Sequence, residues 1–243
     1  EGIILDISDQ KRLEETLVYN NEHDMWTGLY NRQYFEKILD EDSISETNGK
    51  RALVGVNLNA VNSLSMTYGF QYSQQLIKKT VEVLKSICTD TYQLFQTHLN
   101  RFVFYAKGYE DKEELLEFCQ IIINSLEFLF FSERTSFGIG IVEIEEDSKN
   151  NSSQLLKNLL IASEQALNIL ESETAVCFFN KEMEDIIARK ETLKRELGEI
   201  AVGKNSERLY LQFQPVLDLA TNKICGFEAL ARLNSETLGV VSP

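Results

Sequence analysis

The alternation of apolar and polar positions along the chain predicts a succession of helices and strands. Apolar residues at steps of three and four, which lie on one face of a helix, mark the helical segments. These cover residues 9–21, 34–39, 73–87, 111–130, 154–170 and 181–202. Short apolar or alternating runs bounded by polar residues mark the strands. These cover residues 51–58, 92–96, 102–106, 135–144, 175–179, 209–217 and 224–233.

The order of these segments predicts an α+β fold. Strands 92–96 and 102–106 are joined by a tight connection at residues 98–101, which is typical of a β-hairpin. A hairpin mixed with helical crossovers indicates an antiparallel-rich central sheet covered by helices. Phe128, Phe130 and Phe131 cluster at the end of helix 111–130, and all three are expected in the core.

The last part of the chain has a different pattern. Residues 181–202 form a long, highly charged helix, which is typical of a connector. Strands 209–217 and 224–233 alternate around a polar turn, so they are expected to pair as an antiparallel hairpin. Two strands cannot build a core alone. We therefore expect this tail to open a further domain and to pack on a neighbouring chain or on the preceding domain.

Composition narrows the classes of function. The 243 residues include 24 Lys and Arg against 38 Asp and Glu, which gives a net charge of −14. Hydrophobic residues make up 43% of the chain, enough to form a core, and this argues against disorder. The negative charge argues against binding to nucleic acid and against direct contact with an anionic membrane. The chain has no apolar run long enough to span a bilayer, and no signal peptide is expected.

Cysteine and histidine usage predicts neither a zinc site nor a disulfide framework, because the residues are far apart and form no ligand spacing. They are Cys88, Cys119, Cys177 and Cys225, with His23 and His98. The cysteines are expected to act as small apolar residues in a reducing compartment. This predicts a cytoplasmic location, in a parent protein that could carry a membrane anchor upstream. The chain begins without Met and is expected to be part of something longer.

Three segments resemble parts of a known modular arrangement. Residues 23–32 (HDMWTGLYNR) closely resemble the opening motif of GGDEF domains, which make cyclic di-GMP from two molecules of GTP. Residues 5–12 (LDISDQKR) are similar to the end of a PAS sensor domain and the signalling helix after it. Residues 210–232, with FEALAR at 227–232, look like the start of an EAL domain, which hydrolyses cyclic di-GMP.

The resemblance implies a domain plan and a fold. Residues 1–21 would end a PAS domain and form its signalling helix, and residues 22–180 would form a degenerate GGDEF domain. Residues 181–204 would be a connector helix, and residues 205–243 the N-terminal fragment of an EAL domain. The implied fold is nucleotidyl-cyclase-like, with a ferredoxin-like palm covered by helices, flanking signalling helices and a C-terminal β-hairpin. Residues 136–140 (SFGIG) resemble the family's strand after the active hairpin.

The opening motif is interpreted as structural. Thr27 and Gly28 are expected to make a turn, and Asp24 is expected to pair with Arg32 at the start of the next helix. His23 would belong to the junction between helix and turn. Nothing in this motif suggests chemistry.

The hairpin departs from the family pattern, Gly-Gly-Asp/Glu-Glu-Phe. Here the five residues are His98, Leu99, Asn100, Arg101 and Phe102, and only the phenylalanine is retained. Glycines let the backbone approach the nucleotide, and the acidic residues of the family hold Mg²⁺ beside the triphosphate. His98 and Leu99 add side chains, Asn100 is neutral, and Arg101 would repel a dication.

The first core strand departs from the pattern as well. The resemblance places the metal-binding Asp at Asn57 and the phosphate-side Lys at Asn62. The guanine-reading Asn-Asp pair corresponds to Ser65 and Met66, and residues 89–92 (TDTY) stand where an inhibitory Arg-x-x-Asp motif is expected. We therefore predict no catalytic residue and no cofactor in the GGDEF-like domain.

The EAL-like segment keeps its motif. Glu228 matches the family's first metal-ligand Glu, and Gln214, Leu230 and Arg232 match substrate-binding positions or complete the motif. One carboxylate cannot build a two-metal site, so this chain is not expected to hydrolyse anything alone. A complete EAL domain would be expected to use Mg²⁺ or Mn²⁺, and the parent protein could be a phosphodiesterase.

Several hypotheses of function remain open at this point. The first is a regulatory, non-catalytic GGDEF-like domain that relays a signal from a PAS domain to an EAL domain of the same protein. The alternatives are a GTP-binding allosteric domain, a diguanylate cyclase with an atypical site, and a dimerisation module without a ligand. Any homodimer is expected to be weak, through Leu13 and Leu17 of the signalling helix or through the tail.

Overall fold

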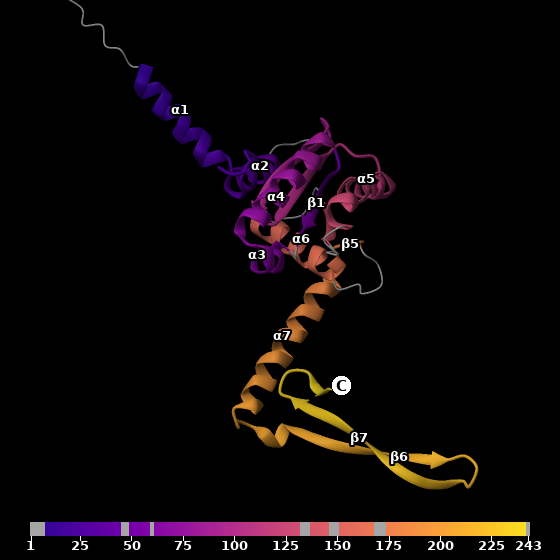
Figure 1. Ribbon diagram of the computed structural model, residues 1–243. Coiled ribbons are helices and arrows are strands. Elements are labelled where there is room, and N and C mark those ends of the chain that lie inside the picture. Colours follow the sequence, from indigo (N-terminus) through magenta and orange to yellow (C-terminus); the bar gives the residue numbers. More distant parts are fainter. Residues whose placement is uncertain are drawn as a thin grey trace, which may run out of the picture. The chain divides into compact units, whose positions relative to one another are not determined.

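The computed structural model describes residues 8–44, 49–58, 61–131, 137–145, 151–167 and 174–241. Residues 1–7, which open the segment expected to end a PAS domain, lie outside these ranges. The chain divides into two compact units, Glu1–Asn180 and Lys181–Pro243, and each is described by itself (Figure 1). The finer domain boundaries implied by the resemblance, after residues 21 and 204, stay predictions.

The first unit contains helices and strands in mixed order. Its helices are α1 (Ser8–Glu22), α2 (Arg32–Ile44), α3 (Val61–Tyr68), α4 (Phe70–Ser86), α5 (Lys112–Phe131) and α6 (Ser152–Leu167). Its strands are β1 (Arg51–Asn57), β2 (Tyr92–His98), β3 (Arg101–Lys107), β4 (Phe137–Ile144) and β5 (Thr174–Phe178). The strands form one sheet in the order β2-β3-β1-β4-β5. Only the β4–β5 pair is parallel, which confirms the expected antiparallel-rich α+β sheet.

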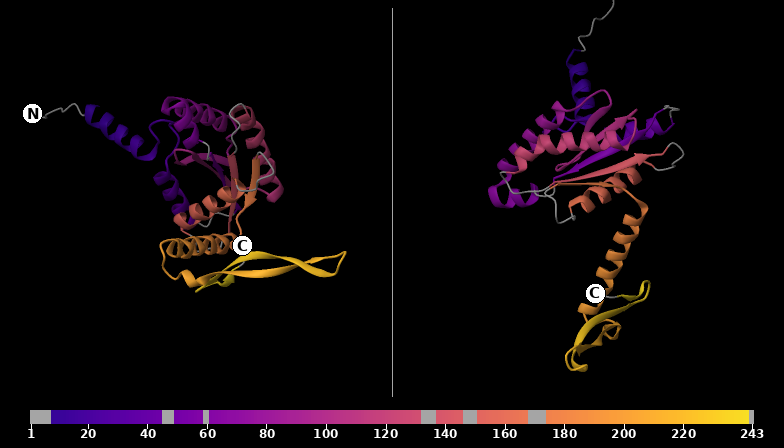
Figure 2. Two further views of the ribbon diagram at one scale, coloured as in Figure 1. Left: turned by 60° about the horizontal axis from the view of Figure 1, so that its bottom comes forward. Right: turned by 90° about the vertical axis from the view of Figure 1, so that its right-hand side faces the viewer.

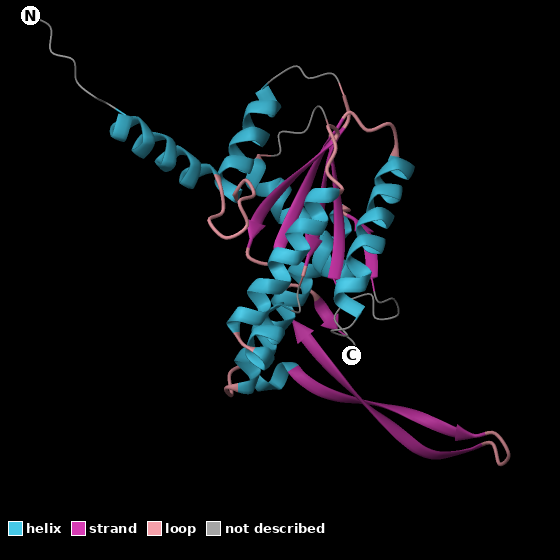
Figure 3. Cartoon of the chain, turned by 45° about the horizontal axis from the view of Figure 1, so that its top comes forward, coloured by secondary structure: helices cyan, strands magenta, loops and turns pink. Residues whose placement is uncertain are grey.

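Helices cover both faces of this sheet (Figures 2 and 3). On one face, α3, α4 and α5 pack on alternate residues of the central strands, including Val54 and Phe104. On the other face, α2 and α6 pack on the intervening residues, including Leu53 and Val103. A strand buried on both faces needs a nearly continuous apolar run, and β1 (RALVGVN) supplies one.

Glycines let α6 lie directly on β4. A Cβ atom on Gly138 would lie 2.3 Å from the carbonyl oxygen of Ser163. A Cβ atom on Gly140 would lie 2.5 Å from the backbone nitrogen of Ser163. Real Cβ atoms do not approach backbone atoms so closely, so any side chain would push α6 off the sheet. The Gly-Ile-Gly sequence of β4 therefore fixes the distance between α6 and the strands beneath it.

Several expectations need correction. Helix α3 was not expected, and Gly69, with φ +89°, separates it from α4. The hairpin strands run further than predicted, so Leu99 and Asn100 alone connect them. Phe130 is buried as expected, but Phe128 is 89% exposed, because it faces away from the sheet on α5. The side chain of Phe131 lies outside the described part.

The second unit contains α7 (Lys181–Ala201), a 3-10 turn η1 (Ser206–Arg208), β6 (Leu209–Asp218), β7 (Lys223–Ser235) and β8 (Gly239–Val241). The predicted antiparallel hairpin is confirmed, with Leu209 opposite Leu233 and Asp218 opposite Lys223. The short strand β8, which was not expected, extends the sheet beside the end of β7. Most side chains of the hairpin are exposed.

The cysteines behave differently from one another. Cys119 is fully buried in the first unit, and burial raises the pKa of its thiol to about 12. Cys88 and Cys225 are exposed, so the expectation that the cysteines act as small apolar residues fails for these two.

Among the described helices, none has the length and apolar character that crossing a membrane requires.

The close approach of α6 to β4 is testable. We expect Gly140→Ala to lower the free energy of unfolding of the first unit by about 1–3 kcal/mol, because the added methyl group overpacks a backbone contact. Urea denaturation followed by the fluorescence of Trp26 measures this change. Gly198→Ala is the control, since nothing lies within 4 Å of its Cβ position. An unfolding midpoint equal to that of the wild type in Gly140→Ala would contradict the packing described.

Candidate functional site

The opening motif forms a turn held by one carboxylate. Asp24 Oδ1 accepts hydrogen bonds from the backbone N–H of Trp26 (3.0 Å) and of Thr27 (2.9 Å), and from the Thr27 hydroxyl (2.9 Å). The expected ion pair between Asp24 and Arg32 is wrong. Arg32 instead pairs with Glu36, one helical turn away, at 2.7 Å.

The opening turn is tied directly to the hairpin through Gln96 of β2. The Gln96 side chain is buried, contacts the Thr27 hydroxyl, and donates to the carbonyl of Leu99 at 3.4 Å. The backbone N–H of Gln96 donates to the carbonyl of Tyr30 at 2.9 Å. The motif therefore positions the hairpin turn, which agrees with its structural interpretation.

Aromatic rings extend this connection to α1. His23 stacks on Tyr19 with ring centroids 4.0 Å apart, and lies 4.4 Å from the ring of Tyr30. Tyr30 in turn contacts Phe95 of β2 at 5.9 Å between centroids. His23 thus lies at the junction between helix and turn, as expected, and joins α1 to the strand that leads into the hairpin.

Asn100 closes the hairpin on the end of β1. Its side chain is 7% exposed, and its Nδ2 donates to the carbonyl of Leu58 at 3.2 Å. The Leu58 N–H donates to the carbonyl of Asn100 at 2.9 Å, and Asn100 Oδ1 lies 3.1 Å from His98 Nδ1. An amide side chain that donates to a backbone carbonyl cannot be replaced by a carboxylate without losing that bond.

Asn57 and Arg101 are two of the three positions that the resemblance assigns to metal-holding acids, the third being Asn100, and they are direct partners across β1 and β3. Both turn to Glu164 of α6. Asn57 Nδ2 donates to Glu164 Oε1 at 3.0 Å, and Arg101 Nη2 pairs with the same oxygen at 3.4 Å. An amide and a guanidinium thus share one carboxylate at this end of the sheet.

Sequence reasoning missed Glu164. It lies between the buried residues Ser163 and Ala166 on α6, and its only signal was a charge beside the apolar face of a predicted helix. Its role depends on the close packing of α6 on β4, which no local pattern of α6 reveals.

A cavity of about 260 Å³ lies beside these residues, between the hairpin strands and α6. Basic side chains of Arg32, His98, Arg101 and Lys157 take part in its lining, together with Asn57. Within the described part of the chain, Asn57 Oδ1 and Arg101 Nε are buried and lack hydrogen-bond partners. The cavity therefore offers buried polar atoms and an excess of basic groups.

The residues present do not fit a divalent metal at this place. Mg²⁺ requires several hard anionic oxygens, whereas the carboxylate of Glu164 is already bonded to a guanidinium and an amide. In the residues that the structure describes, no group of three His, Cys, Asp or Glu side chains could hold a metal ion.

The EAL-like residues lie on the second unit. Gln214 on β6 and Glu228 on β7 are register partners, and the alternation of the strands places Leu230 and Arg232 on the same face. Arg232 Nε donates to Gln212 Oε1 at 2.9 Å. The structure thus brings the four predicted residues to one face of the hairpin, with Glu228 exposed to solvent.

Comparison with known proteins relates both units to cyclic di-GMP signalling proteins. The family model described as "Diguanylate cyclase, GGDEF domain" matches residues 21–171. A signalling protein of Caulobacter vibrioides, described as uncharacterised, is 24% identical over 99% of this chain and 30% of its own length. A cyclic di-GMP phosphodiesterase of Pseudomonas aeruginosa is 24% identical over 94% of this chain and 38% of its own length. The chain thus spans about a third of the length of such relatives.

Solved structures share the fold. The S helix-GGDEF-EAL part of LapD from Vibrio cholerae, bound to c-di-GMP, matches with a TM-score of 0.60 and 13% identity, over 97% of this chain and 54% of that chain. The GGDEF domain of PA1120 (TpbB or YfiN) from Pseudomonas aeruginosa matches with a TM-score of 0.59 and 16% identity, over 68% of this chain and 99% of that chain. The nucleotidyl-cyclase-like fold expected for the first unit is confirmed.

Restoring an acid at Asn100 tests the closure of the hairpin. We expect Asn100→Asp to lower the free energy of unfolding by about 1–3 kcal/mol at pH 7, because a buried carboxylate would replace the donor to Leu58. Burial would raise the pKa of the new carboxyl above its unfolded value, so the loss should shrink below about pH 4, where the acid is protonated in both states.

Urea denaturation of the Asn100→Asp variant at pH 7 and pH 4 measures this effect. Asn124→Asp is the matched control, because Asn124 Oδ1 only accepts a bond, from Gln120, and an aspartate continues to accept it. Equal stability of Asn100→Asp and the control at pH 7 would contradict the donor role of Asn100.

Proposed function

Because this chain belongs to the GGDEF domain family of diguanylate cyclases, we propose that it is a regulatory, non-catalytic member of that family. It relays a signal from an upstream PAS domain to an EAL phosphodiesterase domain of the same cyclic di-GMP signalling protein. The single observation that carries this proposal is the pairing of Asn57 and Arg101 with Glu164 at the positions where the family resemblance implies metal ligands.

The electrostatics of the site oppose catalysis. Phosphoryl transfer depends on positioning and on neutralising the charge of the triphosphate, and metal ions supply most of that neutralisation. Arg101 places a fixed positive charge where a dication would sit, and Asn57 offers a neutral amide. The Asn100 side chain donates its hydrogen bond to the backbone carbonyl of Leu58. The site therefore lacks the groups that hold and orient the reacting triphosphate.

The relay to an EAL domain is supported by the second unit and by the relatives. The face of the hairpin carries Gln214, Glu228, Leu230 and Arg232 together. Two of the relatives are named cyclic di-GMP phosphodiesterases, and the LapD structure contains GGDEF and EAL parts in one chain. In this proposal a complete EAL domain supplies the remaining ligands for Mg²⁺ or Mn²⁺, and the protein works in the cytoplasm.

A second candidate is favoured by the basic cavity. Binding of GTP without turnover would use its basic residues, because guanidinium and ammonium groups pair well with phosphate. The domain would then be an allosteric GTP sensor that regulates the EAL domain. Titration of the chain with GTP by calorimetry, with and without Mg²⁺, separates this candidate from a domain without a ligand.

We expect no conversion of GTP to cyclic di-GMP by this chain in the presence of Mn²⁺, since the acids that the family resemblance implies are absent at Asn57, Asn100 and Arg101. Chromatographic detection of the product measures this. Turnover on the order of 1 s⁻¹, a rate ordinary for enzymes, would contradict the proposal.

The double variant Asn57→Asp, Arg101→Glu separates metal binding from catalysis. It places two carboxylates beside Glu164, so we expect it to bind Mn²⁺ more tightly than the wild type in calorimetry. We still expect no cyclic di-GMP, because His98 and Leu99 remain in the hairpin and Ser65 and Met66 remain at the guanine positions. Activity of the double variant would show that these other substitutions do not matter.

Any self-association through α1 should depend on its exposed leucines. Leu13 and Leu17 are 65% and 67% exposed, and a short apolar seam of this kind gives weak association at most. We expect the variant Leu13→Asp, Leu17→Asp to be monomeric in light scattering at concentrations where the wild type shows a dimer. An unchanged mass would place the contact elsewhere, for example in the tail.

A further inference from the structure

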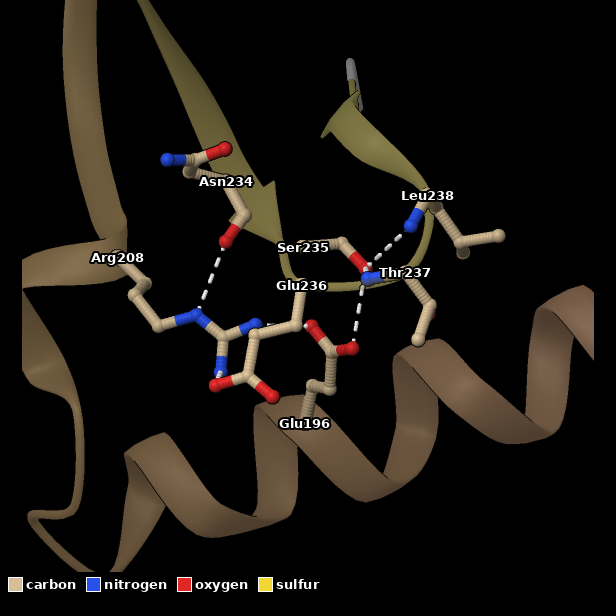
Figure 4. A network of polar contacts seen from close by, with 7 residues as sticks. All are labelled: Glu196, Arg208, Asn234, Ser235, Glu236, Thr237 and Leu238. Carbon is tan, nitrogen blue, oxygen red and sulfur yellow. Dashed lines mark hydrogen bonds and ion pairs between the residues drawn. The ribbon is translucent and has the colours of Figure 1, made fainter.

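A polar network joins α7 to the end of β7 in the second unit (Figure 4). Its centre is Arg208, which lies in the turn η1 and has a side chain only 11% exposed. The guanidinium donates to Glu196 Oε2 on α7 at 2.7 Å, to the carbonyl of Asn234 on β7 at 2.9 Å, and to Glu236 Oε1 at 3.0 Å. One side chain thus contacts the helix, the strand and the turn that follows it.

Glu196 completes the network from the helix. Its side chain is 4% exposed, and both of its oxygens are used, since Oε1 accepts from the Ser235 hydroxyl at 3.0 Å. Ser235 Oγ in turn accepts from the backbone N–H groups of Thr237 (3.3 Å) and Leu238 (3.0 Å). The network therefore fixes the turn between β7 and β8 as well as the helix.

Little else in the second unit is buried. Among its described residues, only Glu196, Leu233 and Ser235 are buried, and two of these three belong to the network. A buried ion pair contributes little net stability compared with apolar packing, but it fixes orientation, because separating its partners leaves a charge in a desolvated place. The attachment of α7 to the strands thus depends on polar contacts of defined geometry.

We propose that Arg208 is a positioning residue that couples α7 to the strand carrying Glu228. Its ion pair with Glu196 makes the C-terminal half of α7 and the end of β7 a single rigid body. A rotation or shift of α7 then moves β7 with it, including Glu228, seven residues before Ser235 on the same strand. The regulatory meaning of this coupling rests on the proposed function, in which Glu228 belongs to an EAL site.

The coupling predicts a narrow distribution of distances between α7 and β7. Spin labels at Cys225, which is exposed on β7, and at an introduced Lys190→Cys on α7 report it by double electron–electron resonance in the full chain. Cys88 and Cys177 are changed to serine, and the buried Cys119 is retained. We expect Arg208→Met to widen the distribution at least about twofold, because removing one partner of a buried pair releases the other.

Arg195→Met is the matched control, since Arg195 precedes Glu196 on α7 and is exposed. It should leave the distribution unchanged, and an unchanged distribution in Arg208→Met would overturn the proposal. If the circular dichroism of Arg208→Met shows that the strands are lost, the variant Glu196→Gln tests the coupling instead.

Glu196→Gln keeps the size of the side chain and its contact with Ser235 but removes the negative charge. The proposal requires that it also widens the distribution of distances between α7 and β7. None of these measurements requires an active EAL or GGDEF domain, so failure of the coupling is distinguishable from failure of the proposed relay.

Discussion

The close packing of α6 against β4 is the constraint on which the geometry of the hairpin site depends. Gly138 and Gly140 leave room for the backbone around Ser163 to contact the strand directly. This approach brings Glu164, the next residue on α6, to the ends of β1 and β3. A larger residue in β4 would move α6 outward and take the carboxylate away from Asn57 and Arg101. The charge distribution of the site therefore follows from backbone packing as much as from the residues in the hairpin.

At the end of β1 and β3, the carboxylate of Glu164 is neutralised by an amide and a guanidinium, those of Asn57 and Arg101. A cluster of carboxylates without a cation is unfavourable because like charges repel one another. Here Arg101 supplies the positive charge, and Asn57 and Asn100 satisfy neighbouring acceptors. The hairpin consequently closes without an ion, and its connection through Gln96 and Tyr30 to α1 is retained. In the proposed function, these contacts transmit the signal and the hairpin takes no part in phosphoryl transfer.

The fold could be predicted from the sequence because periodicity and turn chemistry are local. The buried run of β1, the hairpin, and the amphipathic helices α4 and α6 were all expected. Helix α3 was not, because it has only eight residues and its two buried apolar residues, Val61 and Leu64, span a single turn. Phe128 was assigned to the core on spacing alone, yet its position on α5 directs it to solvent.

The polar contacts of the sites were harder to predict. The sequence did not reveal Glu164, Arg208 and Glu196, because their roles depend on contacts between separate segments of the chain. The ion pair of Asp24 with Arg32 was predicted wrongly, since Asp24 Oδ1 accepts hydrogen bonds within its own turn and Arg32 pairs with Glu36.

In the proposed function, the Arg101 guanidinium occupies the place of a divalent cation in a GGDEF domain. Anomalous X-ray diffraction from crystals of the chain grown with Mn²⁺ and a non-hydrolysable GTP analogue tests it most directly. The account predicts no manganese peak beside Asn57 and Arg101, with Arg101 still paired to Glu164. A manganese ion coordinated by Glu164 or by Asn57 Oδ1, with Arg101 displaced from the site, would contradict it.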